Sequence, residues 1–268
     1  MDTQTIALTN TQQLKESYDR DGYVFIPGFL SEDEMQELND KLASYMQNVV
    51  PGLPPQRAVY LDPNDPDSLV QLFYMDQYDP YCAHLLNNSK FRRLAELLLN
   101  EQVTPQNLEF FNKPARVGKP TPPHQDNYYF MLTPPAAVTL WLALEDVDAE
   151  NGCVRYVKGS HRHGMRPHGR TKTVGFSQGM TDFGTPDDWA AEVAFPARPG
   201  DLLVHHSMTV HWADGNRSPS RTRRALGFIY FAESAKEDKA RKEAYQQELS
   251  AQKEAYQREL NAQASIQQ

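Results

Sequence analysis

Two residues of metal-binding types stand two positions apart in the segment PPHQDNYYF, where His124 precedes Asp126. On an extended segment, side chains at positions i and i+2 point to the same side, so an imidazole and a carboxylate would converge from one short strand. Two histidines and one carboxylate on one face of an octahedron leave three positions open, which suits non-haem Fe(II) with a co-substrate and O₂. The pair alone also fits a surface-loop histidine beside a solvated aspartate, so the metal hypothesis needs a third ligand.

The segment PGDLLVHHSMTVHWADGNRSPSRTRRALGF, residues 199–228, offers that ligand. Pro-Gly-Asp predicts a tight turn into the strand LLVHH, and His211 precedes a polar turn that leads into a further strand, RRALGFIYF. This pattern places His211 at the end of one strand and an arginine at the start of the next. An arginine there suits 2-oxoglutarate, whose far carboxylate needs a buried, permanently charged, bidentate partner.

His205 and His206 are alternative candidates for the third ligand. Both lie too far before the arginines for the usual strand-turn-strand arrangement, so we interpret them as core or surface histidines of a strand. His161, His163 and His168, in and after the segment GSHRHG, are not assigned to the metal.

Several motifs follow one another in an order that is specific when taken together: DGYVFIPGFLS, FFNKP, HQD, LWLALEDVDAENGCVRYVKGSH, PGDLLVHHSMTVH, an N-x-S and RRA. Over about residues 20–232, the chain resembles the phytanoyl-CoA dioxygenase-like group of Fe(II)/2-oxoglutarate oxygenases. The resemblance implies a double-stranded β-helix (jelly-roll, cupin-like) fold and the use of Fe(II), 2-oxoglutarate and O₂. It also implies that His124 and Asp126 are the proximal metal ligands and that His211 is the distal ligand.

The same resemblance implies that an arginine shortly after His211 binds the far carboxylate of 2-oxoglutarate. Arg223 matches the family's Arg-x-Ala pattern. The segment from His211 is slightly longer than the usual spacing, so Arg224 and Arg221 stay as alternatives. Trp141 falls where family members place an aromatic residue that lines the 2-oxoglutarate pocket, although simple core packing would also explain it.

Residues next to these motifs are candidates for substrate binding. Asn127, Tyr128 and Tyr129 directly follow the metal pair, and whichever of them faces inward should line the substrate cavity. Lys113 belongs to the Asn-Lys-Pro element of the family, although a solvated loop lysine has the same signature.

A concentration of basic residues with interspersed glycines occupies residues 155–172 and includes Arg166. In a chain of net charge −8, it suggests a mobile basic loop over the active site that attracts an anionic small molecule such as a carboxylate, phosphonate or CoA ester. The alternative is a solvated charged loop.

The implied reaction is hydroxylation of an aliphatic C–H bond of a small metabolite, with release of succinate and CO₂. The same iron site would serve desaturation, cyclisation or epimerisation, and a non-catalytic jelly-roll binding module is a further alternative. Asp126 argues against halogenation, because related halogenases replace that carboxylate.

Helices are expected before a β-rich core. The expected early elements are a helix over 11–20, a strand within 21–30, an amphipathic helix over 32–48 capped by Ser31, a proline-rich loop over 50–66, and one or two helices over 79–101. Later strands are expected at NLEFFNKP, NYYFML, AVTLWLALEDV, CVRYVKGSH, AEVAF, DLLVHHSMTVHWA and RRALGFIYF. These elements predict a mainly β fold with flanking helices, one oxygenase domain over 1–235 and a jelly-roll core over about 103–232.

The segment KEAYQQELSAQ (242–252) is followed at once by KEAYQRELNAQ (253–263). An eleven-residue period is close to that of a straight α-helix, and it predicts a C-terminal helical extension over 236–268. One stripe of this helix would consist of Tyr245, Leu249, Tyr256 and Leu260. The stripe would either pack on the core or support a homo-oligomer.

Composition limits the partners. A net charge of −8 argues against nucleic acid, and no apolar run approaches the ~18 residues of a membrane span. Cys82 and Cys153 lack CxxC spacing, so neither a disulfide framework nor a zinc site is indicated. The first residues carry no secretory signal pattern. We therefore expect a cytoplasmic protein with a small-molecule substrate and no membrane partner.

Overall fold

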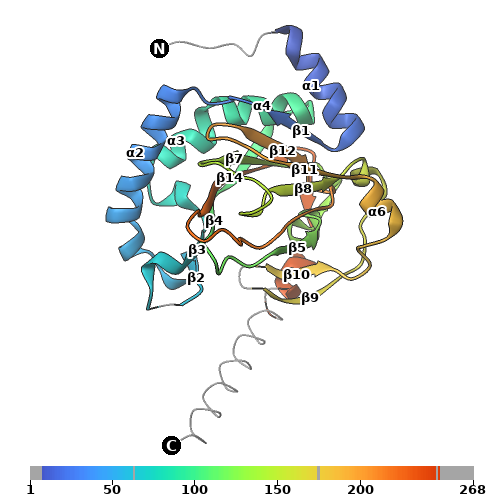
Figure 1. Ribbon diagram of the computed structural model, residues 1–268. Helices are drawn as coiled ribbons and strands as arrows, with labels where there is room; N and C mark the ends of the chain where they lie inside the picture. The colour runs from blue at the N-terminus through green and yellow to red at the C-terminus, as the bar shows by residue number, and fades with distance from the viewer. Residues whose placement is uncertain (1–7, 63, 174–175, 246, 248–268) are drawn as a thin grey trace, which may run out of the picture.

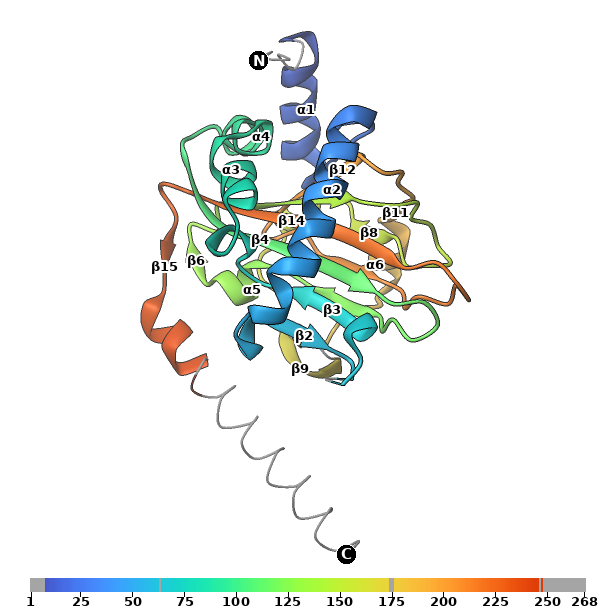
Figure 2. The same ribbon diagram turned by 90° about the vertical axis from the view of Figure 1, so that its left-hand side faces the viewer.

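Two facing β-sheets dominate the computed structural model, which describes residues 8–62, 64–173, 176–245 and 247 (Figure 1). The larger sheet has the strand order β1-β12-β7-β14-β4-β3-β2, and the smaller has the order β11-β8-β13-β5. Helices cover the outer face of the larger sheet, with α2 running across β3 and β4 (Figure 2). The expected mainly β, jelly-roll fold with flanking helices is confirmed.

Antiparallel pairing joins the strands within each sheet. The larger sheet contains β1 (Tyr23–Ile26), β2 (Ala58–Tyr60), β3 (Leu69–Leu72), β4 (Val103–Lys113), β7 (Ala137–Ala143), β12 (Leu202–His206) and β14 (Arg223–Ala232). The smaller contains β5 (Thr121–His124), β8 (Val154–Val157), β11 (Glu192–Phe195) and β13 (His211–Ala213). Two further pairs are β9 (His168–Thr173) with β10 (Phe176–Met180), and β6 (Leu132–Thr133) with β15 (Lys236–Glu237).

The helices lie mainly before the core, as expected. They are α1 (Leu8–Asp21), α2 (Glu32–Asn48), α3 (Pro80–Asn88), α4 (Lys90–Leu99), α5 (Asn127–Phe130) and α6 (Pro186–Ala190). Short 3₁₀ turns are η1 (Val50–Gly52), η2 (Pro55–Arg57), η3 (Pro66–Ser68), η4 (Met75–Gln77) and η5 (Ser160–Arg162). The predicted capping box of α2 is present: the Ser31 hydroxyl accepts from the Glu34 amide, and the Glu34 carboxylate accepts from the Ser31 amide.

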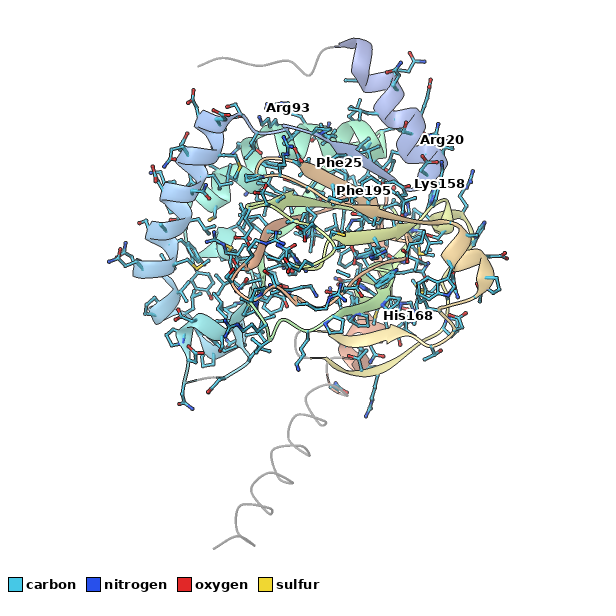
Figure 3. The ribbon with its side chains drawn as sticks, in the orientation of Figure 1. Arg20, Phe25, Arg93, Lys158, His168 and Phe195 are labelled. Atoms are coloured by element: carbon cyan, nitrogen blue, oxygen red, sulfur yellow. The ribbon has the colours of Figure 1, made fainter. Side chains whose placement is uncertain are left out.

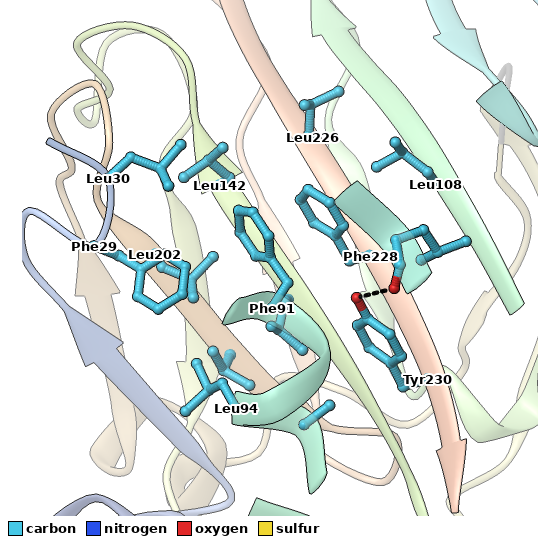
Figure 4. Close-up of a cluster of buried hydrophobic side chains, with 14 of the residues drawn as sticks. Phe29, Leu30, Phe91, Leu94, Leu108, Leu142, Leu202, Leu226, Phe228 and Tyr230 are labelled. Atoms are coloured by element: carbon cyan, nitrogen blue, oxygen red, sulfur yellow. Dashed lines mark hydrogen bonds between the residues drawn. The ribbon is translucent and has the colours of Figure 1, made fainter. Parts of the chain in front are cut away.

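Alternation along β4 and β14 separates a helix-facing core from the interior between the sheets. Outward residues of β14, such as Phe228, pack under α4, where the Phe91 and Phe228 rings stack at 3.9 Å between centroids (Figure 4). The Tyr230 hydroxyl donates to the Leu86 carbonyl at 2.9 Å and ties α3 to the sheet (Figure 4). The opposite face of both strands points between the sheets, and that face builds the cavity described below.

Two expected elements were wrong. NYYFML is not a strand, because Asp126 and the following residues adopt helical backbone angles and form α5, which ends at Met131 in the left-handed region with φ 55°. The proline-rich stretch 50–66 is not simply a loop, since it contains η1, η2 and β2.

The start of the predicted C-terminal extension returns to the core, where β15 pairs with β6. Residues 239–245 are helical. Most of the eleven-residue repeat lies outside the described residues. Within the described part of the chain, no helix combines the length and the apolar character that crossing a bilayer requires.

Candidate active site

Three potential metal ligands converge at one end of the smaller sheet. His124 ends β5 and His211 begins β13, and the two residues are direct partners in the antiparallel register. Asp126 lies beyond the strand in helical conformation, with φ −56° and ψ −34°, so it does not reach the site by the extended i, i+2 geometry expected from the sequence. One ligand atom from each of the three residues nevertheless lies within 4.8 Å of the others.

Backbone carbonyls fix the orientation of both imidazoles. The Nδ1–H of His124 donates to the Pro122 carbonyl at 2.8 Å, and the Nδ1–H of His211 donates to the Thr209 carbonyl at 3.0 Å. Because a carbonyl only accepts, the proton sits on Nδ1 in each ring. Each Nε2 faces Asp126, at 3.5 Å from its Oδ1. This second-layer arrangement is typical of metal-binding histidines.

The two oxygens of Asp126 have different partners. Oδ1 faces both histidine Nε2 atoms, whereas Oδ2 accepts from the Thr139 hydroxyl at 2.6 Å and from His205 Nε2 at 3.1 Å. His205 Nδ1 in turn accepts from the Tyr156 hydroxyl at 2.9 Å, which fixes the His205 tautomer. The sequence prediction missed this role of His205, and the visible signal was its inward alternation in LLVHH.

Charge in this cluster follows from burial and neighbours. Burial opposes ionisation of Asp126, but His211 and then His124 and His205 hold its pKa well below the ordinary value. Burial, reinforced by His124 and His205, holds the pKa of His211 well below its ordinary value. The ionised Asp126 carboxylate therefore faces the neutral His211 imidazole. Deprotonated groups of these two types are the donors that bind a divalent metal.

A cavity of about 280 Å³ opens from this cluster between the sheets. Its walls are mainly aromatic and apolar, with a few polar groups. The lining residues are Gln71, Phe73, Glu109, Phe111, Thr121, His124, Asp126, Tyr129, Phe130, Thr139, Trp141, Val154, His205, His211, Trp212, Ala213, Arg223 and Ile229. Side chains such as Phe25 and Phe195, which do not line the cavity, pack together between the sheets at 5.7 Å between ring centroids (Figure 3).

Of the three candidate arginines, the structure brings only Arg223 to the cavity. Its side chain is buried, its guanidinium lies 5.5 Å from the centroid of the Trp141 ring, and its Nε has no hydrogen-bond partner among the described residues. Burial lowers the pKa of Arg223 to about 10, so the group is still charged at neutral pH.

Arg224 and Arg221 lie elsewhere. Arg224 follows Arg223 on β14 and therefore points to the outer face, where its Nε donates to Glu145 at 3.0 Å. Arg221 is on the polar turn and binds Asp148 at 2.8 Å. Neither side chain lines the cavity.

Lys113 is buried rather than solvated, and it lies opposite Arg223 in the register of β4 and β14. Its Nζ donates to the Lys119 carbonyl and, at 3.1 Å, to the Thr121 hydroxyl. Burial, and then the Arg223 charge, hold the pKa of Lys113 well below its ordinary value. Lys113 lines a smaller adjoining cavity together with Arg223.

Of the three residues after Asp126, only Tyr129 lines the cavity, and its hydroxyl donates to the Gln178 carbonyl at 2.8 Å. Asn127 is buried against the backbone of Leu132. Tyr128 stacks on His168 at 4.3 Å between ring centroids. The helical turn of α5 explains this, because consecutive helical residues point in different directions.

The basic segment 155–172 is not a loop over the cavity. It contains β8, η5 and the start of β9, and Arg166 lies outside the cavity lining. Arg166 binds Asp182 and the buried Asp188, while Arg155 binds Glu192 and Asp214. These charges are balanced by acidic neighbours that the sequence pattern did not reveal, so the expected role of Arg166 in substrate binding has no support in the structure.

Glu109 on β4 and Gln71 on β3 are among the polar residues of the cavity that the sequence analysis did not predict. Gln71 Nε2 donates to Glu109 at 3.0 Å. Burial raises the pKa of Glu109 to about 8 against this hydrogen bond, and the Asp126 charge adds to the rise. The signal in the sequence was alternation, since Glu109 shares the inward face of β4 with Lys113.

Comparisons with known proteins agree with the geometry. The family model for phytanoyl-CoA dioxygenase (PhyH) matches residues 18–225. The peroxisomal phytanoyl-CoA dioxygenase of Mus musculus is 25% identical over 221 residues, covering 78% of this chain and 64% of that protein. Phytanoyl-CoA dioxygenase 1 of Oryza sativa subsp. japonica is 33% identical over 117 residues, covering 42% of this chain and 40% of that protein. The chain thus spans less than two thirds of these two relatives.

Solved structures extend the comparison. The epimerase SnoN, in complex with Fe³⁺, α-ketoglutarate and nogalamycin RO, aligns with a TM-score of 0.67 at 26% identity and 85% coverage of both chains. The carbocyclase SnoK from nogalamycin biosynthesis aligns at 0.64 with 26% identity, covering 84% of this chain and 85% of that one. EctD from S. alaskensis shares the fold: it aligns with a TM-score of 0.66 at 19% identity, covering 86% of this chain and 79% of that one. Because the family model covers most of the chain, the protein belongs to the phytanoyl-CoA dioxygenase (PhyH) family.

Proposed function

We propose that this chain is an Fe(II)- and 2-oxoglutarate-dependent oxygenase in which His124, Asp126 and His211 hold the iron. The observation that carries the proposal is the convergence of these three groups within 4.8 Å at the end of the cavity. The fit to iron is supported by the Nδ1 anchors of both histidines and by the hydrogen bonds that occupy only Oδ2 of Asp126. Two nitrogens and one carboxylate oxygen are the donor set of such iron sites.

Arg223 is the residue that would bind the far carboxylate of 2-oxoglutarate. It is a buried cation at the cavity wall, and its unpartnered Nε gives it hydrogen-bonding capacity for a carboxylate. Trp141 would hold the guanidinium in place by its ring face. A dicarboxylate therefore matches both the charge and the donors that the cavity offers.

Bound Fe(II), with 2-oxoglutarate and O₂, supplies the oxidising power for attack on an unactivated C–H bond, with succinate and CO₂ as co-products. The chain itself contributes orientation and exclusion of water. Aromatic walls that include Phe111, Tyr129 and Trp212 keep the reacting region apolar. Asp126 would keep the third protein position occupied, as the hydroxylases of this type require and halogenases do not.

Hydroxylation is the reaction that we propose for the substrate, a small molecule. Epimerisation and cyclisation are the alternatives, because the similar proteins SnoN and SnoK, at 26% identity, are an epimerase and a carbocyclase. Product mass separates them: hydroxylation adds one oxygen, desaturation or oxidative ring closure removes two hydrogens, and epimerisation leaves the mass unchanged.

The test is a succinate-release screen against a metabolite panel with Fe(II), 2-oxoglutarate and ascorbate, alongside anaerobic Fe(II) titration. His211→Ala should abolish both turnover and tight iron binding, since it removes one ligand of three. His206→Ala is the matched control and should retain both, because His206 does not line the cavity. Tight iron binding by the His211→Ala protein would contradict the proposal.

We also propose, from the sequence, a cytoplasmic location and self-association through the repeat that begins at Lys242. Cys82 and Cys153 are both unpaired and buried, which supports a reducing compartment. Truncation after Ala235 followed by sedimentation tests the second proposal, and an unchanged mass would remove it.

A further inference from the structure

One wall of the cavity is formed by β3 and β4, away from the strands that carry the two histidine ligands. Its polar residues are Gln71 and Glu109, and Phe73 and Phe111 lie beside them. In the sheet, Glu109 stands in one row with Gly227 of β14 and Trp141 of β7. Glu109 thus faces the same space as the ring that packs on Arg223.

Two side-chain amides hold Glu109, with no cation beside them among the described residues. Gln71 Nε2 donates to one of its oxygens at 3.0 Å, and Asn107 Nδ2 donates to the other. Among the described residues, no lysine, arginine or histidine forms an ion pair with Glu109. A buried carboxyl without a cationic partner is costly, because its charged form loses hydration that nothing replaces.

Gln71 carries an unsatisfied acceptor beside Glu109. Its side chain is 5% exposed, and its Oε1 has no hydrogen-bond partner in the described part of the chain. Buried carbonyl oxygens are nearly always satisfied in folded proteins, so this one indicates a donor that binds from the cavity. Gln71 Oε1 therefore lacks a hydrogen-bond donor and Glu109 lacks a cationic partner, and an amine of a ligand would supply both.

The basic side chains near the cavity have other roles than binding an anionic substrate. Arg223 is the buried cation of the cavity, and the proposed function assigns it to 2-oxoglutarate. Arg166 and Arg155 are bound by Asp188 and Glu192, and Arg166 lies outside the cavity lining. Among the described residues, an anionic substrate would find no unengaged cation at this wall, whereas an amine would pair with the Glu109 carboxyl and a hydroxyl would donate to Gln71 Oε1.

We propose that Glu109 and Gln71 are the substrate-recognition residues of this cavity and that they select a small apolar molecule carrying an amine or a hydroxyl over an anionic one. The reaction performed on that molecule rests on the proposed function, whereas its binding preference does not. Phe73, Phe111 and Trp212 would pack against the apolar body of the ligand. The expectation of an anionic substrate is replaced by a hydrogen-bond-donating one.

Three probes of matched size test the proposal: benzylamine, benzyl alcohol and benzoate. Their dissociation constants are measured by ligand-observed NMR and calorimetry on the full chain loaded with Mn(II) and 2-oxoglutarate, which does not turn over. Benzylamine or benzyl alcohol should bind at least about tenfold more tightly than benzoate, which is the effect of one good hydrogen bond to a charged or buried group. Tighter binding of benzylamine would indicate an amine site, and tighter binding of benzyl alcohol would indicate a hydroxyl site.

Glu109→Gln should reduce the preference for benzylamine or benzyl alcohol over benzoate to within about threefold. Gln71→Met should reduce the same preference by a smaller factor. Glu37→Gln is the control for removal of one carboxylate, because Glu37 is exposed on α2, and it should leave all three constants unchanged. If Glu109→Gln does not fold, the probe preference of Gln71→Met tests the proposal by itself.

Equal binding of benzoate and the two donors by the unmodified protein would overturn the proposal. So would absence of binding by all three at millimolar concentration, or an unchanged preference in Glu109→Gln. Repeating the series without metal separates this result from the proposed function. If the preference persists in a chain that releases no succinate, the recognition site is supported and the proposed oxygenase function is contradicted.

Discussion

The metal-facing end and the β3–β4 wall of the cavity are both built from inward side chains of strands, yet their polar atoms are satisfied differently. At the metal-facing end, each histidine Nδ1 has a carbonyl partner, and Asp126 Oδ2 accepts two hydrogen bonds. On the other sides of the cavity, Gln71 Oε1 and Arg223 Nε are buried without partners among the described residues. A buried unsatisfied group costs about 1–3 kcal/mol.

This contrast distinguishes a preorganised site from one that a ligand completes. Atoms that orient the metal ligands have their partners inside the protein, so the geometry is fixed before anything binds. Atoms that would contact 2-oxoglutarate or a substrate have hydrogen-bonding capacity left over. Variants that remove residues from each group should therefore affect different measurements.

Arg223→Leu should have the largest effect. Removing the buried guanidinium should weaken 2-oxoglutarate binding by at least about a hundredfold, because losing one partner of a buried charge pair costs about 2–5 kcal/mol. Arg224→Leu is the matched control, since Arg224 is the next residue on β14 and lies on the outer face. The measurement is calorimetric titration of 2-oxoglutarate into the Mn(II)-loaded protein.

An affinity in Arg224→Leu as low as that in Arg223→Leu would show that the outer arginine, or the strand itself, controls binding. Weakening by less than tenfold in Arg223→Leu would move the role to another cation, of which Lys113 is the nearest along the sheet register.

His205→Leu should have the next largest effect and should act on the metal. It removes one of the two donors to Asp126 Oδ2, so only the Thr139 hydroxyl would hold the carboxylate with Oδ1 toward the histidines. Loss of such a second-layer partner weakens metal binding about 10–100-fold. Anaerobic Co(II) titration followed by absorbance gives the affinity without turnover.

His205→Gln retains an N–H donor and should recover part of the affinity, which a purely structural loss would not allow. His206→Leu is the control, because the neighbouring side chain contacts neither Asp126 nor the cavity. If His205→Leu and His206→Leu lowered Co(II) affinity equally, the positioning role of His205 would be wrong.

The sequence predicted the ordered β-core well because alternation and turns are local signals. Helix α2, with its capping box, and the apolar strands β4, β7, β12 and β14 followed directly from such patterns. The α5 turn was missed, since Asn127–Phe130 carries residues typical of strands. Propensity there is overridden by the turn that carries Asp126 toward the two histidines.

The site was predictable only where a motif named its residues. HQD and VHWA indicated the three candidate metal ligands, and alternation in RRA separates Arg223 from Arg224 once the inward face is known. Gln71 and Glu109 lie 38 residues apart in the chain and meet only through the β3–β4 pairing, which no local pattern specifies. The acidic partners of Arg166 were hidden for the same reason.

The third prediction tests the β3–β4 wall through stability rather than through binding. The pKa of Glu109 is raised from an ordinary 4.5 to about 8, so the folded state binds the proton more tightly than the unfolded state. Between these values the unfolded chain is ionised and the folded one is not, so Glu109 makes unfolding easier as the pH rises, by up to about 1.4 kcal/mol per pH unit. Glu109→Gln removes that titration.

Urea unfolding of the metal-free protein should therefore show that Glu109→Gln gains stability relative to the unmodified chain from about pH 5 to pH 8. The control variant Glu37→Gln should show no such trend. A constant difference across this range would mean that Glu109 is ionised in the folded protein, and it would place a cation beside the wall that is now assigned to a hydrogen-bond donor.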